Sequence, residues 1–424
     1  MTSAAALLDD PQPPPRLDRG TRQTGVRLYN ERLVLSLVRR HSALPKADLA
    51  RLTGLSPPTV SAIVRQLEAD GLLVREAPRR GRVGQPLVPL ALNPDGAFAV
   101  GAKIGRRSCE LVLIDFVGRV RGRRHETYRY PRPGPILDFV VDGCRALAAA
   151  LPQEGRARLA GIGVATPFEL WNWEEEVGAP AGTMQAWRDF DLHGAVGRAC
   201  GLQVYLCNDA TAACAAELLF GAAPRHREFL SVFIAWFIGG GLVIDGNLFP
   251  GRTGYAGSLG QVPVPDGPGT ARPLLHTASL YGLARRIAAS GGDPRPIWES
   301  PDDWRTIGPH LDGWIAQAAA GIAHAIVAAV AVVELQAVVI DGAFPAAVRA
   351  RLVAAVRMAL GALERKGLPQ FTVLEGTIGG SARAIGGASL PFLAKFMRDR
   401  ELLFREPERS AAAGPLHAAR PSAF

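Results

Sequence analysis

Polar and basic side chains gather in two neighbouring segments near the start of the chain. The first segment, residues 57–69, carries small polar side chains and one cation on a single helical face: Thr59, Ser61 and Arg65. The second is a glycine-bearing loop that contains Arg79, Arg80, Arg82 and Gln85. Small polar groups ending in a cation suit the base edges of a DNA major groove, while guanidinium groups suit phosphates and the minor groove. These residue types predict contact with double-stranded DNA. Taken alone, the basic loop has the alternative of being a solvated hairpin.

Three short helices and a hairpin must position these side chains. Apolar residues at helical spacing predict the first helix: Leu33, Val34, Leu37 and Val38. A second helix fits residues 46–53, burying Leu49 and Leu52 and ending at Gly54, because glycine tolerates the left-handed conformation after a helix. In the third helix Ser56 is the expected cap, Pro57 the first residue and Asp70-Gly71 the end; its buried face is Val60, Ile63, Val64 and Leu67. Strands at 72–75 and 87–92 would flank the arginine loop. The pattern is typical of a winged helix-turn-helix over residues 25–93.

The charge distribution agrees with a nucleic-acid module at this end. The 424-residue chain has a formal net charge of +9. Residues 1–90 hold 14 Lys and Arg against 8 Asp and Glu, so about two thirds of the excess positive charge lies on about a fifth of the chain.

The flanks, residues 1–24 and 406–424, are expected to be a disordered leader and a loose tail. Five cysteines without a CxxC pair indicate reduced thiols and a cytoplasmic protein. The apolar run 318–333 is short for a membrane span, so a buried helix is expected.

The rest of the chain alternates strands and helices, and the alternation occurs twice. The first half opens with apolar strands at 98–104 and 109–116, followed by a strand at 120–128, a helix at 136–151 and a strand at 160–164. The second half opens with strands at 229–237 and 241–244 around Ile238-Gly239-Gly240, and continues through helices at 278–289 and 314–335 and a strand at 337–340. A helix at 381–388 comes last. This order predicts a duplicated α/β architecture with a ligand site between the halves.

Across about residues 25–395 the chain resembles the ROK (repressor, open reading frame, kinase) family, especially its bacterial sugar-responsive repressors. The matching stretches are 27–32 (RLYNER), 52–56 (LTGLS) with 59–61 (TVS), 208–210 (NDA), 254–257 (GYAG) and 379–388 (GGSARAIGGA). The resemblance implies a winged helix-turn-helix followed by a two-lobed actin-like ATPase body at 94–405. Lobe one would cover about 94–210 and lobe two about 211–395. It also implies homodimers or homotetramers.

The chain departs from the kinases of that family at both phosphate loops. Lys103-Ile104-Gly105-Arg106-Arg107 stands where the kinases have Asp-x-Gly-Gly-Thr, so a cation replaces a carboxylate that would organise magnesium. In the second loop, Trp236 and Phe237 occupy positions where a phosphate needs glycine. Asp341 precedes Gly342 on the adenine side. The family's zinc site also lacks its ligands, because Gln261 replaces a histidine and residues 269–274 contain no cysteine. We therefore expect no kinase activity, no metal and no cofactor.

The sugar pocket that the resemblance implies is half retained. Asn208 and Asp209 match positions that bind sugar hydroxyls, Asp209 being the catalytic base in the kinases. An amide beside a carboxylate can capture vicinal hydroxyls, although both residue types also cap helices. Ser258, Gln261 and His276 replace a glutamate, a histidine and a glutamate of the family. All three can still form hydrogen bonds, and His276 has the alternative of a structural role.

These observations predict a DNA-binding transcriptional regulator, most simply a repressor, whose body binds a sugar or related metabolite that changes operator affinity. Two alternatives remain at this point. One is an ATP-dependent sugar kinase with a fused DNA-binding domain. The other is a DNA-binding protein whose body is a scaffold for oligomerisation and binds no ligand.

Overall fold

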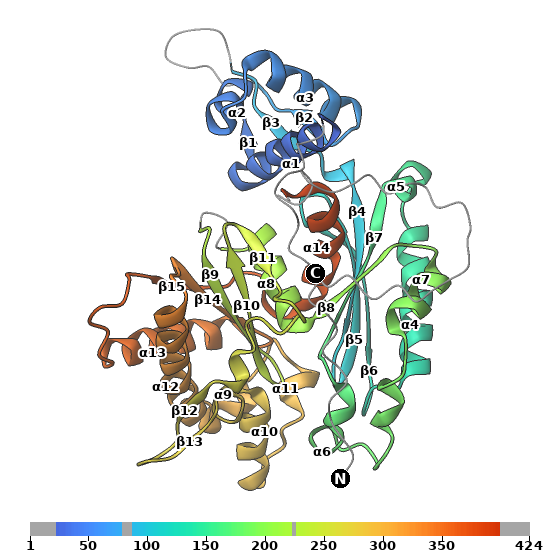
Figure 1. Ribbon diagram of the computed structural model, residues 1–424. Coiled ribbons are helices and arrows are strands. Elements are labelled where there is room, and N and C mark those ends of the chain that lie inside the picture. The colour runs from blue at the N-terminus through green and yellow to red at the C-terminus, as the bar shows by residue number, and fades with distance from the viewer. Residues whose placement is uncertain (1–22, 79–86, 223–225, 399–424) are drawn as a thin grey trace, which may run out of the picture.

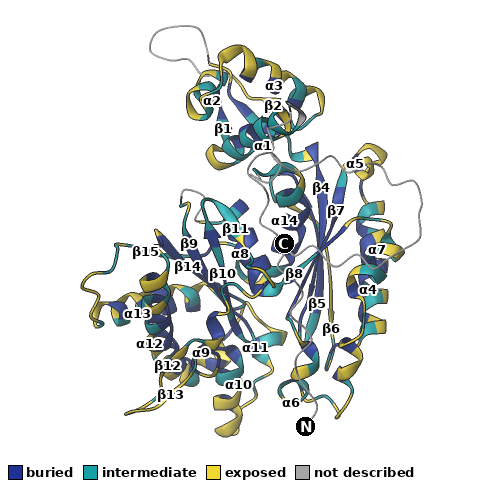
Figure 2. Cartoon of the chain, in the orientation of Figure 1, coloured by how far each residue is buried: buried dark blue, intermediate teal, exposed yellow. Residues whose placement is uncertain are grey.

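The computed structural model describes residues 23–78, 87–222 and 226–398, which form a small N-terminal domain above a two-lobed body (Figure 1). The expected tail, residues 406–424, lies outside the described residues, as does most of the expected leader. Residues 23 and 24 were expected in that leader but belong to the first helix. The burial pattern separates a core in each lobe from exposed helix faces (Figure 2).

The N-terminal domain is the predicted winged helix-turn-helix. Its elements are α1 (Gln23–His41), β1 (Ala43–Leu44), α2 (Lys46–Thr53), α3 (Pro57–Ala69), β2 (Leu73–Arg75) and β3 (Leu90–Leu92). The strands form an antiparallel sheet in the order β1-β3-β2. Gly54 ends α2 with φ 71°, and Ser56 caps α3 by accepting a hydrogen bond from the Thr59 N–H.

Four apolar positions of this domain differ from the expectation. Leu52 is 40% exposed rather than buried. In α1, Leu35 is buried while Leu33 and Leu37 are only partly covered. Helix α1 packs both on elements of its own domain and on α14 of the body, and this second contact explains why Leu35 is buried although the predicted stripe does not include it.

Lobe one is built on a five-stranded sheet in the order β6-β5-β4-β7-β8. Its strands are β4 (Phe98–Ile104), β5 (Ser108–Asp115), β6 (Val120–Thr127), β7 (Leu159–Thr166) and β8 (Val204–Asn208), and its helices are α4 (Pro133–Ala149), α5 (Gln153–Ala157), α6 (Glu174–Val177) and α7 (Leu192–Cys200). The first three strands are antiparallel, whereas β7 and β8 run parallel to β4. Helices α4 and α7 lie side by side along one face of the sheet (Figure 1).

Lobe two repeats this topology in the order β11-β10-β9-β14-β15. Its strands are β9 (Phe229–Ile234), β10 (Ile238–Ile244), β11 (Asn247–Phe249), β14 (Ala337–Gly342) and β15 (Thr372–Glu375), with a separate pair β12 (Pro263–Pro265) and β13 (Ala271–Pro273). Its helices are α8 (Asp209–Phe220), α9 (Leu274–Ala278), α10 (Leu280–Ala289), α11 (Pro296–Glu299), α12 (Gly308–Val332) and α13 (Ala346–Gly361). Hairpin strands again precede two parallel strands, which confirms the duplicated architecture.

The hairpin that opens lobe two turns at a different place from the one expected. The turn is Ala235-Trp236-Phe237, and Gly239 and Gly240 belong to strand β10. A Cβ atom on Gly239 would lie 2.6 Å from the Ala210 Cβ, and one on Gly241 would lie 2.4 Å from the Cys214 Cβ. These glycines therefore let α8 approach β10 closely instead of forming a turn.

Several helices also differ from their predicted bounds; α12, for example, spans Gly308–Val332 instead of 314–335. The segment expected as one helix over 278–289 is broken at Ser279, whose hydroxyl accepts the Ile238 N–H at 2.9 Å. The last helix, α14 (Ala382–Phe396), is longer than expected and contains Pro391. Although the sequence assigns α14 to lobe two, it packs against α8 and against β4 and β7 of lobe one.

Helix α12 is a core helix of lobe two. Within the described residues, the stretch Arg305–Val332 is long and apolar enough to cross a bilayer by length and composition alone. Trp314 and Ile322 of α12 are buried, at 1% and 0% exposure, and the helix packs against α13. Half of the most apolar 18-residue window of this helix is buried inside the protein, as in a core helix.

Candidate functional site

Helix α3 presents part of the predicted DNA-binding face. Thr59, Ala62 and Arg65 are exposed and Ser61 is partly exposed, while Val60, Ile63, Val64 and Leu67 are buried as predicted. Arg65 forms no hydrogen bond or ion pair with any described residue, so its guanidinium is available to a partner. The sequence thus predicts correctly which face of the helix is presented to solvent.

The remaining predicted DNA contacts are in the wing. Arg79, Arg80, Arg82 and Gln85 all lie outside the described residues. At the base of the wing, the Arg75 Nε donates to Glu68 Oε1 at 2.6 Å, which ties β2 to α3. Arg75 therefore has a structural role at this place, although its side chain is 62% exposed.

Replacing Arg65 with alanine is expected to weaken operator binding by about 1–3 kcal/mol if the side chain contacts a base edge. The loss should be greatest at one base pair of the operator, because such a contact reads one base. Fluorescence anisotropy with labelled operator DNA at fixed salt measures it. Arg285→Ala is the matched control, since it removes the same charge from an exposed position on α10 of lobe two. Equal, small effects of both changes would contradict a DNA contact by α3.

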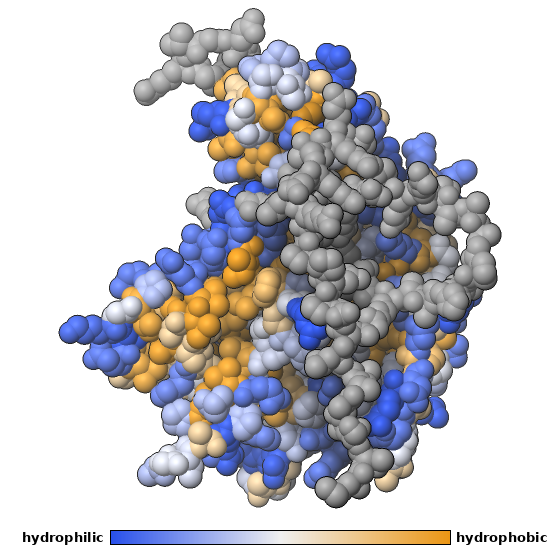
Figure 3. Space-filling view, viewed as in Figure 1, coloured by the Kyte–Doolittle hydropathy of each residue, from blue (hydrophilic) through white to orange (hydrophobic). Residues whose placement is uncertain are grey.

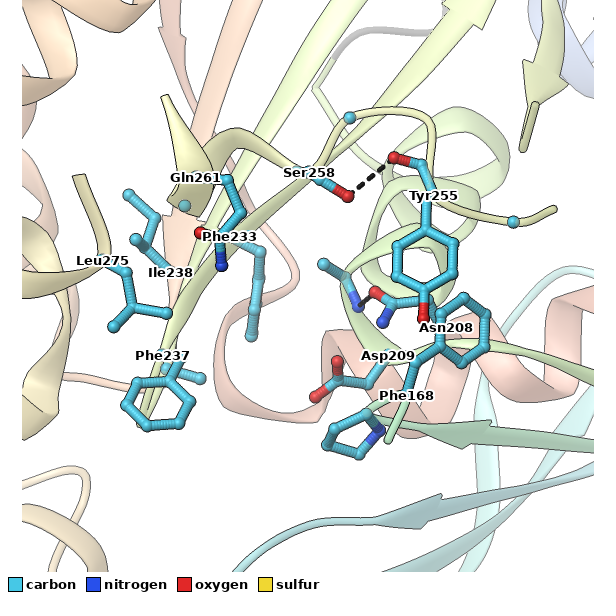
Figure 4. A pocket seen from close by; sticks show the side chains of 18 of the residues that line it. Phe168, Asn208, Asp209, Phe233, Phe237, Ile238, Tyr255, Ser258, Gln261 and Leu275 are labelled. Atoms are coloured by element: carbon cyan, nitrogen blue, oxygen red, sulfur yellow. Dashed lines mark hydrogen bonds between the residues drawn. The ribbon is translucent and has the colours of Figure 1, made fainter. Parts of the chain in front are cut away.

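The body contains a cavity of about 200 Å³ between its two lobes. Lobe one contributes Arg106, Phe168, Glu169, Trp173 and Asn208 to its lining. Other residues that line it are Asp209, Phe237, Tyr255, Ser258, Gln261 and Arg383, among others. Figure 4 shows the Asp209 carboxylate and the Gln261 amide both directed into the space between Phe237 and Tyr255. Four of the five predicted ligand residues are therefore brought together.

The fifth predicted ligand residue is placed elsewhere. His276 is exposed on α9 and is not among the residues that line the cavity. Its neighbour Leu275 lines the cavity instead. On a helix, adjacent residues point in different directions, so only one of the two can face the site.

Asp209 is held by a partner that sequence reasoning did not select. Its Oδ2 accepts from the Arg383 Nη1 at 3.2 Å, and the two side chains are only 15% and 12% exposed. Arg383 is the second residue of α14, and 174 residues separate the two in sequence. Asn208 caps α8, since its Oδ1 accepts from the Ala210 N–H at 2.9 Å, which confirms the capping role. Its side-chain N–H group makes no hydrogen bond to a described residue and remains available.

The two hairpin turns that replace the phosphate loops contact each other across the cleft. The Arg106 guanidinium carbon lies 4.2 Å from the centroid of the Phe237 ring and 4.9 Å from that of the Trp173 ring. Arg107 lies 5.8 Å from the rings of both Trp236 and Trp298. At such distances the negative face of an aromatic ring attracts the guanidinium cation above it. The arginines of the first turn thus pack against the aromatic side chains of the second turn.

Lys103, expected to occupy the position of a magnesium-organising carboxylate, is engaged inside its own hairpin. Its Nζ donates to the Ser108 Oγ at 2.7 Å, and burial lowers the pKa of the lysine to about 8, aided by the nearby Arg383 charge. Among the described residues no group of three or more His, Cys, Asp or Glu side chains could hold a metal ion.

Two buried carboxylates, Glu217 on α8 and Asp341 on β14, lie beside the adenine-side segment. Asp341 accepts from the Gly379 N–H at 2.7 Å and from the Arg349 Nη1 at 2.9 Å. Glu217 accepts from the Thr377 N–H at 3.1 Å and the Ala222 N–H at 3.0 Å. Burial, together with the Asp341 charge, raises the pKa of Glu217 to about 7.

This raised pKa predicts a pH-dependent stability. The folded-state pKa exceeds the ordinary value of 4.5, so the contribution is fully present below that value and is lost as pH rises through about 7. Between about pH 7.5 and pH 6 the free energy of unfolding should rise by about 1 kcal/mol from this group. Glu217→Gln should remove that component of the slope. Chemical denaturation of both proteins at the two pH values measures it; parallel slopes would contradict the shift.

Comparisons with known proteins bear on both parts of the chain. Residues 99–286 match the ROK family, and residues 29–82 match the MarR family. The xylose repressor of Bacillus spizizenii is 27% identical over 242 residues, which cover 57% of this chain and 62% of that protein. The matched region therefore spans less than two thirds of that relative's length.

Solved structures share the fold. The crystal structure of a ROK family transcriptional regulator described as a homolog of the E. coli MLC protein has a TM-score of 0.63 at 19% identity, covering 88% of this chain and 97% of that one. A ROK family glucokinase from Streptomyces griseus, in complex with glucose and AMPPNP, has a TM-score of 0.53 at 20% identity, covering 69% of this chain and 99% of that one. The two-domain arrangement thus occurs in the regulator, while the kinase matches a smaller share of the chain.

Proposed function

We propose that the protein is a sugar-responsive transcriptional repressor, because residues 99–286 match the ROK family and residues 29–82 match the MarR family. The observation that carries the proposal is the combination of an exposed recognition-type face on α3 with a lined cavity that holds Asn208 and Asp209. The similarity to a xylose repressor supports the same class of function.

In this proposal the cavity binds the effector through hydroxyl contacts. Asp209 can accept hydrogen bonds from two neighbouring hydroxyls, and the Asn208 and Gln261 amides can donate or accept at its sides. Tyr255 and Phe237 provide apolar ring faces on opposite sides of the cavity (Figure 4). Ser258 is exposed, and its Oγ donates to the Tyr255 carbonyl at 2.7 Å, so it holds the loop in shape. A carboxylate, amides and aromatic faces form a combination that suits a small polyol.

Two helices connect this cavity with the DNA-binding domain. Helix α8 begins at Asp209 and ends at Phe220, whose ring lies 5.5 Å from the guanidinium carbon of Arg39 in α1. The first turn of helix α14 contains Arg383, which lines the cavity. At its other end the Arg398 N–H donates to the Ser36 Oγ of α1 at 3.2 Å. The Asp209–Arg383 ion pair joins the two helices at the cavity.

We infer that effector binding changes operator affinity through this pair of helices. An effector that competes with Arg383 for Asp209 would alter how the first turns of α8 and α14 are held together. Lobe two is joined to the same region, because the Arg398 Nη2 donates to the Asp245 carbonyl at 2.9 Å. The coupling must come from unequal effector affinity for two arrangements, commonly about 1–3 kcal/mol.

The kinase alternative is disfavoured by the contacts at the hairpin turns. Arg106 and Phe237 fill space that a transferred phosphate would need, and the Lys103 ammonium cannot bind magnesium. We therefore propose that the body binds its ligand without phosphorylating it and needs neither metal nor cofactor. Sugar-dependent ATP hydrolysis by the purified protein, abolished in Asp209→Asn, would restore the kinase alternative.

We further propose that the repressor is cytoplasmic and binds a two-fold operator as a homodimer or homotetramer, because paired winged domains extend the recognised sequence. Apolar side chains gather over lobe two in the view of Figure 3. On this lobe Val332 of α12 is 85% exposed and Met358 of α13 is 76% exposed, which makes it a candidate subunit contact. Analytical ultracentrifugation tests this, and a monomer at all concentrations would contradict it.

The experiment that tests the function is binding of the full chain to DNA from upstream of its own gene. It is run at fixed salt with and without a panel of sugars and sugar acids. We expect a sequence-specific complex whose affinity changes with one member of the panel. Specific binding that no ligand alters would favour the ligand-free scaffold, and absence of specific DNA binding would contradict the proposal.

A further inference from the structure

Arg106 lines the cavity without an ion-pair partner among the described residues. Within the described residues it forms no hydrogen bond or ion pair, and its Nε is buried without a partner. Burial lowers its pKa to about 10, so the side chain stays charged at neutral pH. The rings of Trp173 and Phe237 fix the plane of the guanidinium. Contacts with ring faces leave the in-plane N–H groups unused, and these are the groups that bind oxyanions.

Arg383 presents a second set of donors to the same cavity. Its Nη1 is bound to Asp209, but its Nε is also buried without a partner. Buried donors without partners cost about 1–3 kcal/mol each, so an occupant that supplies acceptors would recover this loss. Both arginines line one cavity of about 200 Å³.

The carboxylates around the cavity do not neutralise both cations. Asp209 is paired with Arg383. Glu169 lies at the exposed edge, where its Oε1 accepts from the Tyr255 hydroxyl at 3.2 Å and its Oε2 from the Asn172 amide at 2.9 Å. The Asp209 charge, and to a smaller extent that of Glu176 on α6, favours the charged form of Arg106, but neither carboxylate is hydrogen-bonded to it. A neutral sugar would leave Arg106 unpaired after binding.

Resting on the proposed function, we propose that the effector is an anionic sugar: a polyol whose oxyanion group, a carboxylate or a phosphate ester, binds Arg106 and Arg383 while its hydroxyls bind Asp209 and Asn208. Arginine suits either oxyanion because its planar fork can donate two parallel hydrogen bonds. Arg106 and Arg383 thereby determine effector specificity. This assignment also explains why two guanidinium groups stand at a site that is otherwise suited to hydroxyls.

Isothermal titration calorimetry of the full chain tests the proposal with four probes: gluconate, galacturonate, glucose 6-phosphate and glucose. We expect at least one anionic probe to bind more tightly than glucose. Arg106→Met, which keeps the stem but removes the charge, should weaken that binding by about tenfold to a hundredfold. Arg106→Lys should fall between, because lysine keeps the charge and loses the fork. Arg285→Met is the matched control and should change little, since Arg285 is exposed on α10 and does not line the cavity.

The outcomes separate the proposal from the function on which it rests. Preference for the acids or for the phosphate ester identifies which oxyanion is recognised. Tight binding of glucose that Arg106→Met leaves unchanged would overturn the anionic effector while the sugar-gated function stands. If none of the probes binds and none alters operator affinity, both the effector class and the sugar-gated function are contradicted. The midpoint of thermal unfolding of each variant confirms that lost binding is not lost folding.

Discussion

Replacing Gly386 with alanine is expected to destabilise the body by about 3 kcal/mol or more, because the new methyl group cannot be accommodated. A Cβ atom at Gly386 would lie 1.7 Å from the Ala212 carbonyl oxygen and 2.3 Å from its carbonyl carbon. Both are backbone atoms of α8, so no side-chain rotation can relieve the overlap. Helices α8 and α14 would have to separate along the contact that joins the cavity to the N-terminal domain.

Gly361→Ala is the matched control for this prediction. Gly361 is the last residue of α13, and a Cβ atom there would meet no atom within 4 Å. Since alanine is the better helix former by about 1 kcal/mol at most, this variant should be neutral or slightly stabilised. Thermal and chemical denaturation compare the two proteins. A Gly386 variant as stable as the control would show that the two helices do not form the close contact described above.

Asp209→Asn is expected to abolish the response of operator binding to effector, so that operator affinity takes one value whether effector is present or absent. The substitution keeps the size of the side chain but removes the negative charge that accepts hydroxyl hydrogen bonds and pairs with Arg383. Hydrogen bonds to charged groups contribute about 1.5–3 kcal/mol each, so effector affinity should fall about tenfold or more. Anisotropy titrations of operator DNA with and without effector measure both properties.

Asp138→Asn provides the control, because Asp138 is exposed on α4 and does not line the cavity. It should respond to effector like the unmodified protein. If the Asp209 variant keeps a full response, the effector does not bind at this carboxylate. If it loses operator binding without a lower midpoint of thermal unfolding, breaking the Asp209–Arg383 pair reproduces the action of the effector. If the midpoint falls as well, Asp209 supports the fold, and the Arg106 variants then become the decisive test of the cavity.

Local signals explain which parts of this structure the sequence predicts well. Helix α2 has the predicted bounds, and the caps at Gly54 and Ser56 are those that the residue types favour. Such features depend on neighbouring residues, as do the alternating strands of each half. The exposed face of α3 follows from helical periodicity alone.

Contacts between distant segments explain most of what the sequence does not predict. Nothing near Asp209 in the sequence indicates that Arg383 is its partner. The cavity wall that includes Phe168, Glu169 and Trp173 comes from a stretch without regular periodicity, so no pattern marks it. Arg106 was expected only as a departure from a phosphate loop; its contact with Phe237 depends on two lobes meeting in space.

The most direct test of the central claim is a measurement of reciprocity between the two sites. If the effector changes operator affinity by some factor, the operator must change effector affinity by the same factor. Calorimetric titration of effector into the full chain, with and without saturating operator DNA, measures this. We predict an effector affinity that differs by about 5-fold to 150-fold between the two states, equal to the factor seen in DNA titrations. The same effector affinity in the presence and absence of operator would contradict a ligand-gated repressor.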